Sequence, residues 1–167
     1  MAGLRSFGAY IPLWRLPRDT IAKAWGRGSL GGERSVANHD EDTLTMAVEA
    51  GIDCLRAVPR EEVDGLFFAS TTATYKEKLS AALVALALDL PRSARTADFG
   101  NSLRAGTSAL LAAIDAVKAG SLRNVLVVAA DSRMGYARTD FEQLLGDAAA
   151  AVLVTSDDGA ARIEDAV

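Results

Sequence analysis

The chain has 167 residues, of which 50% are hydrophobic and 24% are charged, enough for one buried core in a soluble globular domain. Its net charge of -4 and pI near 5.0 indicate no overall basic character, so nucleic acid and an anionic membrane are not expected as main partners. A single cysteine, Cys54, rules out an internal disulfide, and with one histidine, His39, the chain cannot build a Cys/His metal site.

The sequence also predicts the cellular location of the protein and its number of domains. No apolar run reaches the roughly 18 residues that a membrane span needs, and the first residues lack the blocks of a signal peptide. We therefore expect a cytoplasmic protein. No repeat or linker divides the sequence, which predicts one domain over residues 1–167.

The first forty residues predict a strand, a helix and a loop. LRSFGAYIPLWRLP alternates loosely and carries two prolines, which predicts a strand that leaves the sheet near Tyr10. DTIAKAWG predicts a short helix that starts at a capping Asp19 or Thr20 and stops at Gly26. The stretch 27–38 is rich in Gly and Ser, which predicts a mobile loop.

DEDTLTMAVEAGIDCLRAV predicts the next helix, because its acidic start favours a helix N-terminus and its apolar residues recur three to four apart. The residues expected to face the core are Leu44, Ala47, Val48, Ile52 and Leu55. Cys54 lies beside them, so we expect a buried apolar filler rather than a nucleophile.

Strands and helices then alternate. VDGLFFAST predicts a strand buried on both faces, KEKLSAALVALALDL a helix ended by Pro91, and ARTADF a second strand. SLRAGTSALLAAIDAVKAGS predicts a long helix closed by Gly120, and NVLVVAAD a third apolar strand. This order predicts the α/β class, with a mixed sheet covered by helices.

The last third of the sequence predicts a loop followed by a hairpin. Residues 132–143 mix charged and small side chains, which is typical of a loop. LLGDAAAAVLVTSDDGAARIEDAV predicts two strands joined by a turn at Asp157, Asp158 and Gly159.

Four stretches resemble the first half of the thiolase superfamily, in the same order along the chain. They are FGAYIPLWRL, DEDTLTMAVEAG, DFGNSLRAGTSAL and GDAAAAVLV. Each alone is weak, whereas the collinear set is specific, and the closest likeness is to hydroxymethylglutaryl-CoA synthase and ketoacyl synthase III. The resemblance implies a thiolase-like half-fold, one half of the layered αβαβα architecture, with the second half absent from residues 1–167.

The resemblance also implies a function. Members are acyltransferases that form carbon–carbon bonds in lipid metabolism, with acyl-CoA or an acyl carrier as substrate and coenzyme A as ligand, and with no other cofactor. The resemblance implies a homo- or hetero-oligomer with a thiolase-like subunit, a dimer formed through the strand ARTADF and the strand–helix bend DFGNSLRAGTSA (residues 98–109, hereafter the elbow).

In this family the elbow carries a cysteine that accepts the acyl group as a thioester, three residues before a Gly-Thr pair. Here Gly106 and Thr107 form that pair, and Leu103 stands at the nucleophile position. A hydrocarbon side chain cannot be acylated. A shift of one residue would place Ser102 there, but we expect its hydroxyl to cap the following helix.

The general base is also replaced. Synthases of the hydroxymethylglutaryl type use a glutamate in the turn after the second strand, and Thr71 stands at that position. A hydroxyl is no base at neutral pH. Glu77 follows six residues later, where we expect an exposed position on the first turn of the next helix. With nucleophile and base both missing, the site is predicted to be catalytically silent.

Three residues of the elbow are the predicted substrate-binding residues: Arg104, Gly106 and Thr107. The guanidinium fork of Arg104 suits a phosphate of coenzyme A, although a plain surface cation is the alternative. His39 precedes an acidic helix start, where a capping or electrostatic contact explains it better than catalysis.

Aromatic and basic residues outside the elbow are further candidates. Trp14 and Trp25 flank the Gly-rich loop and either stack on adenine or fill the core. The resemblance implies that Arg133, Tyr136 and Arg138 line a substrate tunnel or form a dimer contact. The alternative is that they lie on a loop exposed to solvent.

Three functions remain open from the sequence. The first is a non-catalytic acyl-CoA-binding partner of a thiolase-like subunit, or the first half of a condensing system. The second is an active acyltransferase or thioester-processing enzyme that uses residues outside this chain. The third is an unrelated α/β binding module.

Overall fold

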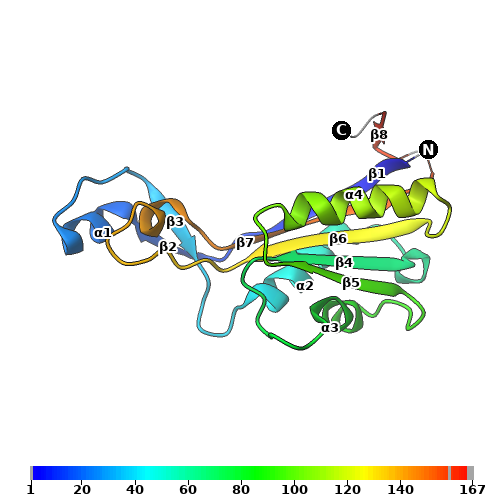
Figure 1. The fold of residues 1–167 in the computed structure, drawn as a ribbon, viewed down its shortest axis with the longest axis horizontal. Helices are drawn as coiled ribbons and strands as arrows, with labels where there is room; N and C mark the ends of the chain where they lie inside the picture. The colour runs from blue at the N-terminus through cyan, green and yellow to red at the C-terminus, as the bar shows by residue number, and fades with distance from the viewer. Residues whose placement is uncertain (1, 158, 165–167) are drawn as a thin grey trace.

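The computed structural model describes residues 2–157 and 159–164, and it consists of one large sheet with helices on both faces and an arm at one end (Figure 1). The large sheet has the strand order β5-β4-β6-β7-β1-β8, and β2 and β3 form a separate pair. The strands are β1 (Ala2–Tyr10), β2 (Trp14–Pro17), β3 (Glu33–Val36), β4 (Gly65–Ser70), β5 (Arg95–Gly100), β6 (Asn124–Asp131), β7 (Ala148–Thr155) and β8 (Ala161–Ile163). The helices are α1 (Arg18–Trp25), α2 (Thr43–Cys54), the 3-10 turn η1 (Arg60–Glu62), α3 (Ser80–Ala87), α4 (Ala105–Lys118) and α5 (Phe141–Leu144).

The three strands predicted in the alternating middle of the sequence, VDGLFFAST, ARTADF and NVLVVAAD, are confirmed and form the parallel part of the sheet. β4 lies between β5 and β6 and is parallel to both. Every residue of β4 is buried, as expected for a strand covered on both faces. Parallel strands end at the same edge, so the residues that follow β4, β5 and β6 are brought together there. The expected mixed sheet covered by helices is also confirmed.

Helices divide the core into two layers. α2 and α3 pack on one face of the sheet, and α4 packs on the other (Figure 1). The predicted inner face of α2 is wrong in part, because Ile52 is 42% exposed while Met46 and Ala50 are fully buried. The buried face of α2 consists of Thr43, Met46, Ala47, Ala50, Gly51 and Cys54, and Ile52 lies outside it.

An arm projects from one end of the sheet, and we define it as residues 11–38 and 132–146 (Figure 1). It contains β2, α1, β3 and α5. The predicted loop over 27–38 is wrong for its second half, because β3 pairs antiparallel with β2. The 132–143 loop likewise contains the start of α5.

Two other boundary predictions need correction. α1 starts at Arg18 after Pro17, with no side-chain cap among the described residues, although its end at Gly26 is confirmed by the left-handed φ of +62°. α3 begins at Ser80, so Glu77 lies before the helix rather than on its first turn.

The predicted C-terminal hairpin is wrong. β8 pairs with β1 and not with β7, so β1 lies between the two strands. β7 and β8 are still joined by a turn that includes Asp157 and Gly159, while Asp158 lies outside the described residues. No helix within the described part of the chain is both long and apolar enough to cross a bilayer.

Candidate functional site

The elbow joins β5 to α4 through a tight bend. β5 ends at Gly100, and Asn101 follows with a φ of +60°, a left-handed conformation that asparagine tolerates better than most residues. The Ser102 hydroxyl accepts a hydrogen bond from the Arg104 backbone N–H at 3.1 Å. Ser102 therefore binds a backbone N–H as predicted, but it does so within the bend, because the N-cap position of α4 is Arg104.

A small pocket of about 50 Å³ lies where the ends of β4 and β6 meet the elbow. It is lined by Ala69, Ser70, Thr71, Ser102, Leu103, Ala105, Gly106, Ala129 and Asp131. The structure thus brings the two predicted catalytic positions, Thr71 and Leu103, to one pocket together with Gly106. Arg104 and Thr107 are exposed beside it and are not among its lining residues.

Leu103 is 78% exposed at the bend, two residues before α4 begins. The N-terminus of a helix of this length carries a partial positive charge that favours an anion such as a thiolate. The elbow therefore presents a side chain at a place suited to a nucleophile, and that side chain is a hydrocarbon.

Asp131 is a site residue that the sequence analysis missed. One of its oxygens, Oδ1, accepts hydrogen bonds from the backbone N–H groups of Thr71 at 2.7 Å and Thr72 at 3.1 Å. The same oxygen accepts the hydroxyls of Ser70, Thr71 and Thr72 at 3.1, 3.0 and 2.9 Å. The signal was a carboxylate at the end of an apolar strand, whose parallel neighbour ends in a run of hydroxyl residues.

Asp131 therefore fixes the turn at the base position, because the Thr71 hydroxyl donates to a carboxylate and is held in one direction. We predict that Asp131→Ala lowers the free energy of unfolding by about 2–3 kcal/mol, since several donors around a part-buried site lose their shared acceptor. Urea denaturation followed by circular dichroism measures the change. Asp115→Ala, an exposed carboxylate on α4, is the matched control, and equal stability of the two variants would contradict the role.

The arm brings a second set of candidates together. The Arg138 guanidinium lies over the Trp25 ring, 5.1 Å from its centroid. The Glu142 Oε2 atom accepts hydrogen bonds from Trp25 Nε1 at 2.8 Å and from the Arg138 backbone N–H at 3.0 Å. We call these residues, Trp25 and Arg138, the clamp. One carboxylate thus holds both members of the clamp.

The core interpretation of the two tryptophans is wrong, because Trp14 is 59% exposed and Trp25 is 36% exposed. The interpretation of the 132–143 loop as merely solvated is also wrong, because Arg138 and Glu142 bind α1. Tyr136, by contrast, is 84% exposed, so its ring projects into solvent rather than packing into the clamp.

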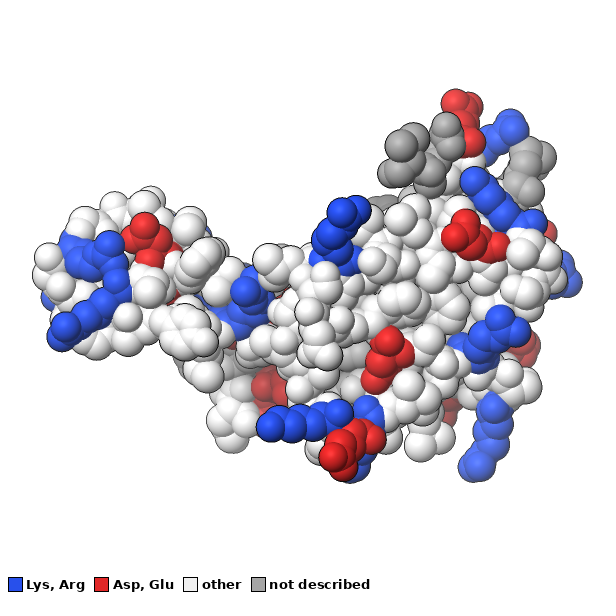
Figure 2. Space-filling view, in the orientation of Figure 1, with Lys and Arg blue, Asp and Glu red and all other residues white. Residues whose placement is uncertain are grey.

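The arm is basic although the chain as a whole is acidic. It contains seven Lys and Arg residues and four Asp and Glu residues, in a protein of net charge -4. Figure 2 shows Lys and Arg side chains gathered at its free end. Arg27 lies beside the clamp, where it donates to the Arg138 carbonyl and to Asp140 Oδ1 at 3.2 Å. This end of the molecule is suited to an anionic ligand.

The remaining sequence candidates lie elsewhere. Cys54 is 2% exposed and contacts the Ser6 hydroxyl at 3.4 Å, so the prediction of a buried filler is confirmed. Burial raises the pKa of the Cys54 thiol, an effect that the Ser6 hydrogen bond opposes. Glu77 is exposed, and exposed His39 contacts the Asn38 side chain at 3.1 Å. The cap of α2 is Asp42.

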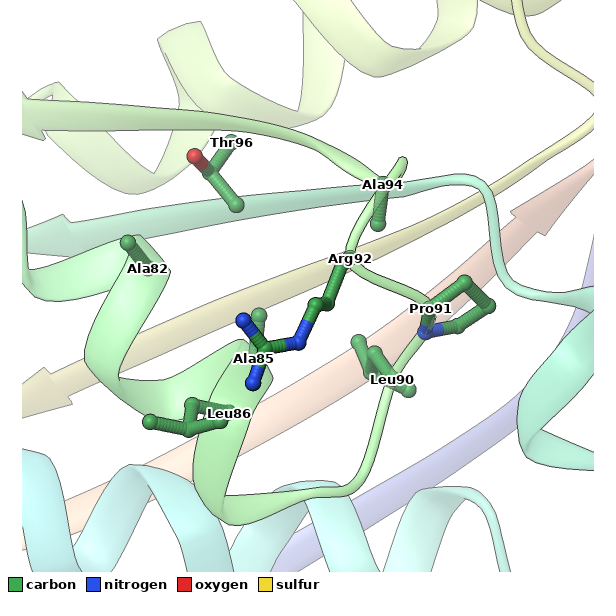
Figure 3. Close-up of a pocket in the computed structure, with 8 residues that line it drawn as sticks. All are labelled: Ala82, Ala85, Leu86, Leu90, Pro91, Arg92, Ala94 and Thr96. Carbon is green, nitrogen blue, oxygen red and sulfur yellow. The ribbon is translucent and has the colours of Figure 1, made fainter.

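A larger cleft of about 350 Å³ lies between α3 and the start of β5 (Figure 3). Its walls are mostly apolar, and the Arg92 side chain extends across it beside Ala85 and Leu86 (Figure 3). None of the predicted site residues lines it. Within residues 2–157 and 159–164, no three His, Cys, Asp or Glu side chains are grouped to hold a metal ion.

The sequence of this chain is similar to the sequences of two kinds of condensing enzyme. A model of 3-oxoacyl-(acyl-carrier-protein) synthase III matches residues 97–167. The hydroxymethylglutaryl-CoA synthase of Methanocella arvoryzae is 31% identical over 164 residues, which cover 93% of this chain and 47% of that relative. The chain spans about half the length of the curated relatives it matches.

Two solved structures show the same fold. The ketoacyl-(acyl-carrier-protein) synthase III from Thermus thermophilus matches with a TM-score of 0.83 and 27% identity, over 93% of this chain and 51% of that one. The protein MvaS, solved in complex with 3-hydroxy-3-methylglutaryl coenzyme A, matches with a TM-score of 0.84 and 26% identity, over 93% of this chain and 40% of that one. The alternative of an unrelated α/β module is therefore wrong.

Proposed function

Because the chain is a thiolase-superfamily protein that resembles hydroxymethylglutaryl-CoA synthase and 3-oxoacyl-(acyl-carrier-protein) synthase III, we propose that it binds CoA thioesters without forming a covalent acyl-enzyme. The observation that carries the proposal is Leu103, an exposed hydrocarbon at the start of α4. Covalent acyl transfer needs a nucleophile at that point and a base beside it. Thr71, at the base position, donates its hydroxyl to Asp131 instead.

The arm supports coenzyme A as the ligand. Coenzyme A carries an adenine ring and several phosphates, and a base ring stacks favourably on an indole or a guanidinium plane. The clamp, Trp25 and Arg138, offers both planes, and Arg27 beside it offers a charge for phosphate. Arg104, Gly106 and Thr107 stay the proposed contacts for the part of the ligand that reaches the elbow.

The proposal includes a role in an assembly of the condensing type. The chain acts as a non-catalytic partner of a thiolase-like subunit or as the first half of a longer acyltransferase, over a domain of residues 1–167. β5 supports a dimer, because it is the last strand at its side of the described sheet and its outer edge is free to pair. The partner strand would lie beside residues 95–99 and next to the elbow.

We predict that the protein binds coenzyme A and acetyl-CoA reversibly and gains no acetyl group. Titration calorimetry measures the binding, and mass spectrometry after incubation with acetyl-CoA measures the covalent product. Trp25→Ala should weaken coenzyme A binding about tenfold, since base stacking on an aromatic ring contributes about 1–3 kcal/mol. Trp14→Ala, the other exposed tryptophan of the arm, is the control.

Two outcomes would contradict the proposal. An acetyl group on a peptide that contains residues 99–110 would show an active elbow, and the loss of that label in Ser102→Ala would identify the serine as its nucleophile. An absence of binding to both ligands would remove coenzyme A as the ligand of the arm.

A further inference from the structure

Arg34, on β3, connects the two segments of the arm. Its Nη1 donates to the Glu142 carbonyl at 3.0 Å, and its Nη2 donates to the Arg133 carbonyl at 3.3 Å. Nη2 also lies 3.8 Å from Asp147 Oδ1. One guanidinium thus contacts both ends of the segment 132–146. A planar fork of donors is suited to such a junction, whereas an ammonium group is not.

Asp147 binds β3 and the residue that follows it. Its Oδ2 accepts the Ala37 backbone N–H at 2.7 Å, and its carbonyl accepts the Ser35 hydroxyl at 2.7 Å. The side chains of Arg34 and Asp147 are only 9% and 6% exposed. The two residues therefore form a buried ion pair at the base of the arm.

This ion pair is incompletely satisfied. Within the described part of the chain, neither Arg34 Nε nor Asp147 Oδ1 has a hydrogen-bond partner, although both atoms are buried. A buried pair with unsatisfied atoms contributes little net stability, because the desolvation of two charges offsets their attraction. Its effect is therefore on geometry, since it fixes where the segment 132–146 lies relative to β3.

We propose that Arg34 is a positioning residue for the clamp, an inference that rests on the proposed binding of coenzyme A by Trp25 and Arg138. Arg34 holds the main chain of Glu142, and the Glu142 carboxylate holds Trp25 Nε1 and the Arg138 backbone N–H. The hydrogen bonds that Arg34 donates among the described residues go to the Glu142 and Arg133 carbonyls, not to the clamp. Arg34 therefore acts through Glu142, and it sets the distance between the indole and the guanidinium.

The test compares three probes: coenzyme A, adenosine 3′,5′-bisphosphate and pantetheine. Arg34→Met keeps most of the apolar stem and removes every donor. It should weaken coenzyme A and the bisphosphate by the same factor, about tenfold, and leave pantetheine unchanged. Arg34→Lys keeps the charge without the fork and should restore only part of the affinity. Arg15→Met, at an exposed ion pair on the neighbouring strand β2, is the matched control and should change no affinity.

Equal weakening of pantetheine, or full coenzyme A affinity in Arg34→Met, would overturn the inference. A second readout needs no ligand, because the Trp25 indole N–H is hydrogen-bonded and its hydrogen exchange is measurable by NMR. Arg34→Met should speed that exchange and leave the Trp14 indole unchanged. If the wild type binds neither coenzyme A nor the bisphosphate, the proposed function fails, and the Trp25 exchange rate alone decides whether Arg34 positions the clamp.

Discussion

Replacing Gly8 with alanine should lower the free energy of unfolding by about 3 kcal/mol, at the upper end of the usual cost of an overpacked core. Gly8 lies in β1 at the point where the strand crosses α2. A methyl group there would come within 2.3 Å of the Cys54 nitrogen and 2.5 Å of the Ala50 oxygen. These are backbone atoms of a helix, so they cannot rotate away as a side chain would. The strand and the helix must separate instead.

Gly106→Ala is the matched control for that experiment, because the same methyl group would meet nothing closer than Ala129 Cβ at 3.8 Å. Gly106 lies in the first turn of α4, where alanine favours the helix by up to about 1 kcal/mol. Chemical denaturation of the two variants should therefore show opposite shifts. Equal stability of Gly8→Ala and the wild type would mean that β1 and α2 are farther apart than the structure has them.

The strands of the parallel layer were predictable because their signal is local. β4 and β6 are runs of apolar residues buried on both faces, and such runs are visible without any knowledge of neighbours. The pairing partner of a short edge strand, by contrast, is not determined by the sequence around that strand. β8 follows β7 after a turn, which favours a hairpin, but it pairs with β1, a choice made by residues more than a hundred positions away.

The polar elements of the arm were missed for a related reason. β3 has the sequence ERSV and no buried residue, so neither alternation nor an apolar run marks it. It is a strand because β2 pairs with it and because Asp147 and Glu142 bind it from another segment. Long-range polar contacts of this kind leave no periodic signal in the sequence.

The candidate site was predictable as far as the family pattern reaches. Thr71, Leu103 and Gly106 were chosen by position in a motif, and they do lie at one pocket. Their roles in catalysis and binding remain predictions. Asp131 was missed because it accepts hydrogen bonds from residues 59 to 61 positions away, and Glu142 because it accepts one from Trp25, 117 positions away. Only the fold creates these relations.

Leu103→Cys should convert the elbow into an acceptor of acetyl groups, the largest change we expect from a single substitution. The introduced thiol would first lose its proton to solvent, and the thiolate would then attack the carbonyl carbon of acetyl-CoA. A carbon–sulfur bond to the protein would form, the carbon–sulfur bond to CoA would break, and CoA would leave as a thiolate that takes up a proton from solvent. Position 103 is exposed and precedes a 14-residue helix, whose N-terminal partial charge lowers the pKa of a thiol. Mass spectrometry of the peptide that contains residues 99–110 measures the product.

Two control thiols, one native and one in a separate variant, separate the effect of the elbow from ordinary thiol chemistry. Cys54 is buried and its pKa is raised, so it should stay unlabelled in every variant. Leu86→Cys places a thiol that is also exposed, at 64%, near the C-terminal end of α3, where the helix dipole opposes ionisation. At neutral pH the Leu103→Cys protein should gain label at least about tenfold faster than the Leu86→Cys protein. Equal rates would mean that the elbow gives a thiolate no advantage, and the replacement of cysteine by leucine would then not explain a silent site.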